Sequence, residues 1–313
     1  MRDRLTISPG GYRRVTFLAL VALGFIVVTG GAVRVTGSGL GCPDWPTCAE
    51  GRIVAPLEYH ALIEFVNRMV TGTVSIMVIV AVLAALRRRP YRRDLVWLAG
   101  GLVLGVVGQI VLGGLVVLFH LYPPLVMGHF VVSMILVADA VVLHHRAGLA
   151  DGPAPAPAAG PELRQFGSWL VVWSAVVLAL GTVVTGSGPH AGSNEGDFVE
   201  RLPFEVRDVA RIHAVAVWIL LALTLYTLWR ARKERAPADV QARGGVLLTV
   251  LFGQGAIGYL QYFTDVPAAL VAIHIGGATA LWVAVLRFRL GLASAGAATG
   301  HRPDHHPDPA LVT

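Results

Sequence analysis

The chain has few charged residues and only two cysteines. Of its 313 residues, 14% are Asp, Glu, Lys or Arg, whereas soluble domains carry roughly 25%. Hydrophobic residues make up 55%, and the mean hydropathy is +0.66. This composition excludes an ordinary soluble domain and predicts an integral membrane protein. Alternating segments of about ten residues are also lacking, which argues against a transmembrane β-barrel.

Eight apolar stretches are present, each near the ~20 residues that a helix needs to cross the hydrocarbon. The first could pass for a signal peptide, but Arg34 and Gly-rich polar sequence follow it without a small-residue cleavage site, so we interpret it as a retained helix. We therefore expect an all-α integral membrane protein with eight transmembrane helices, at about 15–33, 63–86, 94–119, 124–143, 167–186, 209–229, 245–263 and 266–286.

Basic residues are concentrated on one side of the predicted membrane. The positive-inside rule makes that side the cytoplasm, and it then holds both termini. Because the membrane topology accounts for the excess of basic over acidic residues, no nucleic-acid partner is inferred. Loops 34–62 and 187–208 are long and lie on the outer side. The 19 cytoplasmic basic residues, of 25 in all, are Arg2, Arg4, Arg13, Arg14, Arg87, Arg88, Arg89, Arg92, Arg93, Arg146, Arg164, Arg230, Arg232, Lys233, Arg235, Arg243, Arg287, Arg289 and Arg302.

The sequence repeats itself. Gly108-Gln109-Ile110-Val111-Leu112-Gly113 precedes His129, and Gly253-Gln254-Gly255-Ala256-Ile257-Gly258 precedes His274, so that each Gln lies twenty residues before its His. Val35-Thr36-Gly37-Ser38-Gly39 is likewise answered by a Val-Thr-Gly-Ser-Gly segment in the second half. The repeat predicts two tandem four-helix bundles related by a pseudo-two-fold axis along the membrane normal.

The chain divides at its polar segments. An Ala/Pro-rich stretch is interpreted as a cytoplasmic linker, and the Ala/Gly/His/Pro-rich tail as disordered. His301, His305 and His306 in this tail could bind a metal, but a solvated tail is the preferred interpretation. The predicted units are a cytoplasmic N-terminus at 1–14, a first half at 15–146, the linker at 147–166, a second half at 167–290 and the tail at 291–313.

Three histidines are expected at one depth, near the outer face. His129, His213 and His274 lie at comparable positions in their spans. Paired imidazoles from facing helices can hold a haem iron from both sides, so the repeat suggests two related haem pockets. His213 and His274 make such a pair in the second half. In the first half the repeat aligns Asn67 with His213, and Asn is a poor haem ligand.

A carboxylate lies in the first half only. Glu64 and Asn67 are three residues apart and share a helix face, whereas the repeat aligns Glu64 with Ala210. An acid near a membrane-embedded pocket is a functional candidate by default. The alternative is that Glu64 pairs with Arg68 and anchors the helix end.

Other charged residues lie near the predicted pockets. Arg34, Arg68 and Arg211 suit haem propionates, although interfacial anchoring to lipid head groups would explain them too. Asp139 lies deeper, toward the cytoplasm, where it could pair with His144 or take part in proton movement.

Cys42 and Cys48, the only cysteines, both fall in the first outer loop. Because that compartment is oxidising, we expect a disulfide. It would be either a structural staple or a redox-active pair, with the staple preferred. Two cysteines without an adjacent histidine make a metal site the weaker alternative.

These residues resemble a known family. Thr36-Gly37-Ser38-Gly39-Leu40-Gly41-Cys42-Pro43-Asp44-Trp45-Pro46-Thr47-Cys48, followed by Ile63-Glu64-Phe65-Val66-Asn67-Arg68, is similar to the haem A synthases, over roughly residues 15–290. The resemblance implies oxidation of the C8 methyl group of haem O to a formyl group, giving haem A for terminal oxidases. It implies haem b on His213 and His274, substrate haem on His129, a catalytic role for Glu64, and a Cys42–Cys48 disulfide.

The chain departs from the family at one position. Family members often carry Glu-x-x-His where this chain has Asn67, so His129 alone, with water or another residue opposite, is expected to hold the substrate iron. His60 would have to fold back from the loop, because seven helical residues rise by ~10 Å.

Two other classes of protein compete with the enzyme. A non-catalytic dihaem b-type electron carrier predicts two complete imidazole pairs. A transporter predicts broken helices or midplane charges in both halves. The enzyme is favoured, in the cell membrane, with haem O and lipid as partners. The haem O-producing farnesyltransferase, a quinone or other electron partner, and a second copy of the chain stay open as further partners.

Overall fold

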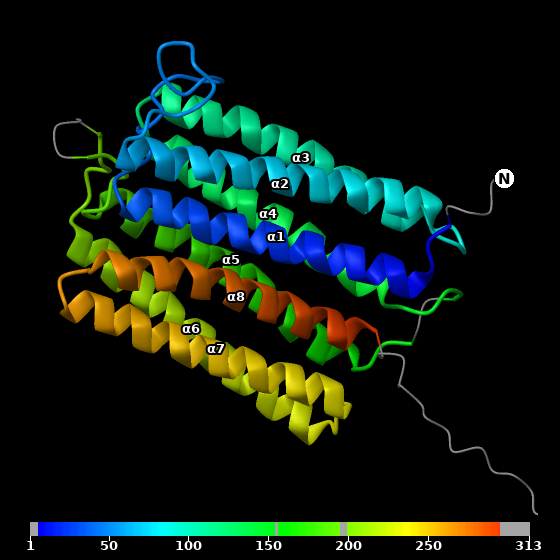
Figure 1. The fold of residues 1–313 in the computed structure, drawn as a ribbon. Helices are drawn as coiled ribbons and strands as arrows, with labels where there is room; N and C mark the ends of the chain where they lie inside the picture. The colour runs from blue at the N-terminus through cyan, green and yellow to red at the C-terminus, as the bar shows by residue number, and fades with distance from the viewer. Residues whose placement is uncertain (1–5, 154–155, 195–198, 295–313) are drawn as a thin grey trace, which may run out of the picture.

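The computed structural model describes residues 6–153, 156–194 and 199–294. Within these ranges the regular structure is helical apart from two isolated β-bridges. Figure 1 shows the helices lying lengthwise beside one another. The eight helices are α1 (Pro9–Val35), α2 (Tyr59–Arg87), α3 (Arg93–Leu118), α4 (Pro123–Ala147), α5 (Pro161–Ser187), α6 (Val206–Lys233), α7 (Ala238–Phe263) and α8 (Ala268–Ala293).

All eight helices are long and apolar enough to cross a membrane, which confirms the predicted multi-pass, all-α class. Most run a few residues beyond the apolar stretches, and α1 is capped by a side chain. Ser8 accepts a hydrogen bond from the Gly11 N–H, and Pro9 follows at a first-turn position, where its missing N–H costs nothing. α5 begins at Pro161, inside the predicted linker.

The predicted tail lies almost wholly beyond the described residues. α8 continues to Ala293, so the first residues of the range 291–313 are helical. His301, His305 and His306 lie outside the described residues.

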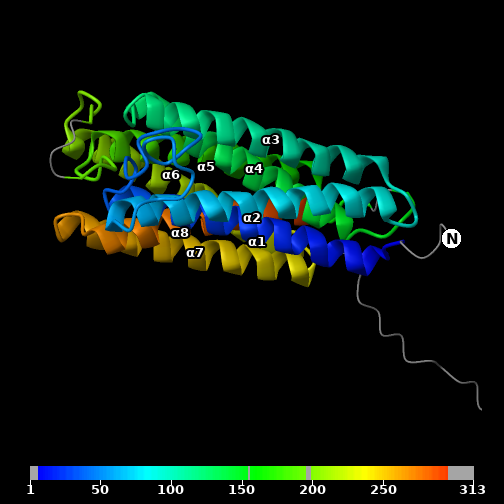
Figure 2. The ribbon, with the colours of Figure 1, turned by 45° about the horizontal axis from the view of Figure 1, so that its top comes forward.

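Each set of four helices packs as a ring, in which α1 meets α2 and α4, α3 meets α2 and α4, and α5 to α8 repeat the same contacts. The two sets meet where α1 contacts α8 and where α4 contacts α5 and α8. Figure 2 shows the same helices from a second direction. A symmetry axis along the membrane normal stays a prediction.

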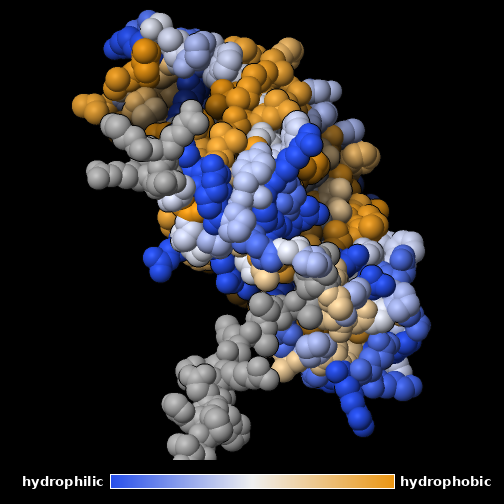
Figure 3. Space-filling view, turned by 90° about the vertical axis from the view of Figure 1, so that its right-hand side faces the viewer, coloured by the Kyte–Doolittle hydropathy of each residue, from blue (hydrophilic) through white to orange (hydrophobic). Residues whose placement is uncertain are grey.

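The two ends of the bundle differ. Segment 36–58 and the described parts of 188–205 lie at one end, and α1 begins at the other (Figure 1). Figure 3 looks at this second end and shows hydrophilic side chains gathered across it, between apolar flanks. The helix ends there carry basic residues, including Arg87 on α2, Arg146 on α4 and Arg230 on α6. One end of the molecule is therefore basic and the other carries the long loops.

Small residues let the helices approach closely, as is common in membranes. Leu136 of α4 lies over Gly105 of α3, and a Cβ at Gly105 would overlap its side chain. The two sets of helices meet in the same way, because a Cβ at Gly31 would lie 3.1 Å from the Ile275 side chain. A hydrogen bond adds to this interface: Trp282 of α8 donates to the Met134 carbonyl of α4 at 2.9 Å.

Trp282→Phe is expected to destabilise the contact between the two sets of helices. The ring stays, but the buried Met134 carbonyl loses an interhelical partner, worth about 0.6–2 kcal/mol in membrane helices. Thermal unfolding in detergent measures the loss. Trp97→Phe is the matched control, because Trp97 is 68% exposed. Equal melting temperatures for the two variants would show that this bond does not hold the halves together.

Candidate functional site

One continuous cavity of about 1390 Å³ extends through both sets of helices. Sites for a single drug-sized ligand are roughly 300–1,000 Å³, so this one is large. It includes the histidines of both related pockets that the repeat suggests. Glycines of α1 and α5, including Gly31 and Gly181, line it. The predicted residues that line it are Arg34, Glu64, Asn67, Arg68, His129, Arg211, His213 and His274.

Each of the three histidine rings lies against a glycine of a neighbouring helix. A Cβ at Gly113 would lie 3.3 Å from Cε1 of His129, and one at Gly181 would lie 3.3 Å from Cε1 of His213. The corresponding distance from Gly258 to His274 is 3.2 Å. The Nδ1 atom of each ring is buried. Nε2 is therefore the ring nitrogen that each histidine can offer to a ligand in the cavity.

The repeated glutamines hold two of these histidines. Gln109 of α3 donates through Nε2 to the His129 carbonyl at 2.9 Å, and Gln254 of α7 donates to the His274 carbonyl at 3.0 Å. Gln109 also contacts Ser133 of α4. The spacing of twenty residues thus joins adjacent helices at the depth of the histidine. Sequence reasoning found the repeat but not this role.

Asn67 occupies the place that the repeat assigns to an imidazole. Its Oδ1 accepts a hydrogen bond from Thr29 of α1 at 2.8 Å, and the side chain lines the cavity. His60 lies elsewhere: its Nδ1 is 2.9 Å from Ser38 Oγ, and the residue lines a smaller pocket between the outer loops. The structure thus brings Asn67 to the cavity, together with His129, and leaves His60 in the first turn of α2, beside the outer loops.

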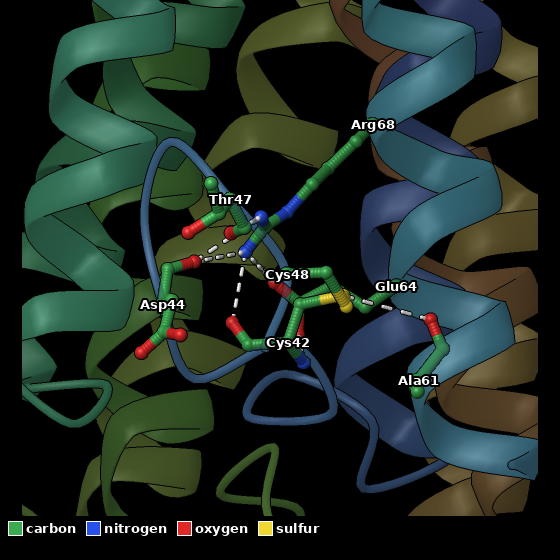
Figure 4. The surroundings of a disulfide bond; sticks show 7 residues. All are labelled: Cys42, Asp44, Thr47, Cys48, Ala61, Glu64 and Arg68. Carbon is green, nitrogen blue, oxygen red and sulfur yellow. Dashed lines mark hydrogen bonds and ion pairs between the residues drawn. A yellow bond between two sulfur atoms is a disulfide. The ribbon is translucent and has the colours of Figure 1, made fainter. Parts of the chain in front are cut away.

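Glu64 and Arg68 join helix α2 to the outer loop. Glu64 is 5% exposed. One carboxylate oxygen lies 2.6 Å from Arg68 Nη2, and the other accepts the Cys42 N–H at 2.8 Å. Arg68 also donates to the carbonyls of Cys42, Asp44 and Thr47, at 2.9, 3.2 and 2.7 Å (Figure 4). The predicted anchoring pair is present, and both of its members also line the cavity.

The Cys42–Cys48 disulfide forms as predicted. Both cysteines are buried, and they pack with Ala55 and Ala61. The loop between them also reaches α3, where Trp45 covers Gly114: a Cβ there would lie 2.6 Å from the indole ring. The disulfide loop, residues 42–48, is therefore held by α2 on one side and contacts α3 on the other, and its Trp45 lines the cavity.

The remaining charged candidates are spread out. Arg34 of α1 donates to the Thr185 carbonyl of α5 at 3.0 Å. Arg211 is largely exposed, 3.6 Å from Asp208. Asp139 lies beside Gly101 of α3, whereas His144 lies 3.0 Å from Thr16 Oγ1. No hydrogen bond or ion pair joins Asp139 to His144 in the described part of the chain.

The side chains at the cavity suit a metal complex in which the bound molecule itself supplies most of the ligands of the metal. In the described ranges no three His, Cys, Asp or Glu side chains gather closely enough to hold a metal ion on their own. Haem iron needs only axial protein ligands, and a large apolar cavity accommodates its macrocycle. His213 of α6 and His274 of α8 line one cavity from two helices, each with a glycine behind the ring. These residues fit a haem.

Comparison with known proteins gives a consistent result. Residues 13–286 match the family model COX15-CtaA, described as cytochrome oxidase assembly protein. Heme A synthase of Listeria monocytogenes is 29% identical over 269 residues, which cover 82% of this chain and 87% of that protein. Heme A synthases of Lysinibacillus sphaericus and Shouchella clausii are 26% and 25% identical, with 82% and 81% of this chain and 87% of each of those proteins covered.

Arg68→Gln is expected to loosen the disulfide loop. A hydrogen bond to a charged group is worth about 1.5–3 kcal/mol, so losing several should speed reduction of the disulfide by about tenfold or more. The rate with a water-soluble phosphine measures this. Arg52→Gln is the control, because Arg52 pairs only with exposed Glu50 through its side chain. Equal reduction rates in the two variants would exclude Arg68 as the anchor.

Proposed function

The chain belongs to the COX15-CtaA family of cytochrome oxidase assembly proteins, and we propose that it is a haem A synthase. It would oxidise the C8 methyl group of haem O to the formyl group of haem A. One observation carries the proposal: Glu64 and His129 line the same cavity as the pair His213 and His274. A carboxylate for chemistry and imidazoles for iron thus share one largely apolar cavity.

His213 and His274 are the residues proposed to hold the iron of a resident haem b. Burial of Nδ1 and the glycine behind each ring leave Nε2 for the iron. The Gln254 amide fixes the backbone at His274. When bound, this haem would supply an electron acceptor beside the substrate. Arg211 at the cavity edge would meet its propionates.

The substrate haem belongs in the first half. His129, held by Gln109, would bind its iron from one side. Asn67 lines the same cavity and is a poor iron ligand, so the substrate iron would have a single imidazole from this half. Arg34 lines the cavity and would pair with the substrate propionates. Arg68 already donates to Glu64 and three loop carbonyls, so it would act on the substrate chiefly by positioning Glu64.

Glu64 has two compatible roles in the oxidation. Removing electrons from a methyl group on a conjugated macrocycle leaves positive charge, which a nearby carboxylate stabilises strongly at low dielectric. The same carboxylate could take a proton from the water that attacks this carbon. Each two-electron step then adds one hydroxyl and releases two protons. A second step gives a geminal diol, which loses water to form the aldehyde.

The charge distribution suggests an orientation. The basic end of the bundle would face the cytoplasm with both termini, and the haem sites would lie toward the outer face of the cell membrane. Haem O arrives from the farnesyltransferase that makes it, so a handover complex with that enzyme is a natural partner. The electron acceptor beyond haem b would be a quinone or another carrier, and self-association is a further candidate contact.

Glu64→Gln is expected to lower haem A formation by about 10²–10³-fold, the usual effect of removing one electrostatic group from a reacting centre. The Gln side chain has the shape of Glu, and the hydrogen bonds from Arg68 to the loop carbonyls stay in place. Chromatography of haems extracted from protein expressed with haem O measures the product. Glu58→Gln, at the exposed start of the same helix, is the matched control. Normal haem A yield in Glu64→Gln would remove Glu64 from the mechanism.

Alanine variants of the histidines should separate the two haems. His274→Ala is expected to lose the absorption spectrum of haem b, because only one axial imidazole is left. His129→Ala should keep that spectrum and lose binding of haem O. An electron carrier with two permanent haems would instead contain two haem b groups and lose one in each variant. Spectra and haem-to-protein ratios of the purified proteins distinguish these outcomes.

A further inference from the structure

Two aromatic residues that line the cavity form a bridge between α6 and α7. Trp218 of α6 donates through Nε1 to the Tyr259 hydroxyl of α7 at 2.9 Å. Both residues line the cavity, and both are partly exposed, at 57% and 46%. The hydrogen bond ties the two helices together across the wall of the second half.

The first half lacks this bridge. Asn67 aligns with His213, which places Gly72 where the second half has Trp218. Gly113 aligns with Gly258, which places Gly114 where the second half has Tyr259. The structure supports the α3 alignment, because Gly113 and Gly258 each touch the histidine ring of their own half. At the two positions where the second half has the aromatic bridge, the first half therefore has glycines, one on α2 and one on α3.

These two glycines have different surroundings. Gly72 is exposed, lines the cavity, and has nothing within 4 Å of an added Cβ. Gly114 is buried because Trp45 lies on it. The first half therefore takes its aromatic cover from the disulfide loop, whereas the second half takes it from its own helices. A side chain on a loop can leave without separating two helices.

We propose that the wall between α2 and α3, at Gly72 and Gly114, is where haem O passes between the bilayer and the His129 site, with Trp45 as its movable cover. This inference rests on the proposed function, since haem O is the substrate there. The Trp218–Tyr259 bridge correspondingly retains the haem of the second half.

The chemistry of the substrate favours entry from the side, out of the bilayer, rather than entry from the aqueous phase at the end of the bundle. Haem O carries a long isoprenoid tail, and each CH₂ moved from lipid to water costs about 0.8 kcal/mol. A gap that opens toward lipid lets the tail stay in hydrocarbon while the macrocycle enters. Gly72 is compatible with such a passage, because any larger side chain at this position would project into it.

The passage can be tested by closing it with tryptophan at Gly72, the residue that the second half has at the aligned position Trp218. Gly72→Trp should slow the uptake of haem O from liposomes by about tenfold, within the one to three decades that on-rates span among variants of one interface. Uptake is followed by the Soret shift in protein purified without haem O. Haem b content should not change. Gly108→Trp is the matched control, since Gly108 is exposed, has open space around it and does not line the cavity.

Removing the cover should have the opposite effect. Trp45→Ala is expected to speed the transfer of bound haem O to apomyoglobin by about tenfold, while Arg68 still holds the loop carbonyls. This second variant also serves if Gly72→Trp fails to accumulate. An unchanged transfer rate in Trp45→Ala would overturn the role of Trp45, and equal uptake by Gly72→Trp and Gly108→Trp would overturn the passage.

The same experiments separate this inference from the proposed function. Wild-type protein that takes up haem O at a rate sensitive to Gly72→Trp, yet never oxidises it, would refute the synthase and keep the passage. Formation of haem A together with equal uptake rates in the two tryptophan variants would keep the synthase and refute the passage.

Discussion

The structure depends on the close approach of helices at glycine. Inside a bilayer the hydrophobic effect does not drive helices together, so packing and a few hydrogen bonds must do so. Glycine serves two purposes here. Where an aliphatic side chain lies on it, as Leu136 does on Gly105, two helices lock together. Where an imidazole lies on it, as His274 does on Gly258, a ring is fixed with one nitrogen left for a ligand.

Backbone carbonyls hold many of the polar side chains near the cavity. Gln109 and Gln254 donate to the carbonyls of the histidines, and Arg68 donates to those of the disulfide loop. Buried polar groups are costly without such partners. The carbonyls are fixed by the chain itself, so these bonds also position the helices and the loop. The site is therefore built by the same contacts that stabilise the fold.

Much of this arrangement could be predicted from the sequence, for identifiable reasons. Eight helices followed from eight apolar stretches, and the matched depths of His129, His213 and His274 agree with their lining one cavity. The cover of Gly114 by Trp45 could not be predicted, because it joins a loop to a helix distant in the chain, and no periodicity records such a contact. The continuous cavity was missed for a similar reason, since it depends on how the two halves face each other.

The differences between the halves all favour one interpretation. At aligned positions the first half has Glu64, Asn67, Gly72 and Gly114, where the second has Ala210, His213, Trp218 and Tyr259. The first half thus combines an acid, a single imidazole at the matched depth in the cavity and glycines at the positions of the aromatic bridge. The second half has a complete pair and an aromatic bridge. Two permanent electron-carrying haems would need equal retention, and any one difference could be incidental. Together they match the proposed enzyme, which requires one half that exchanges its haem and another half that keeps its haem.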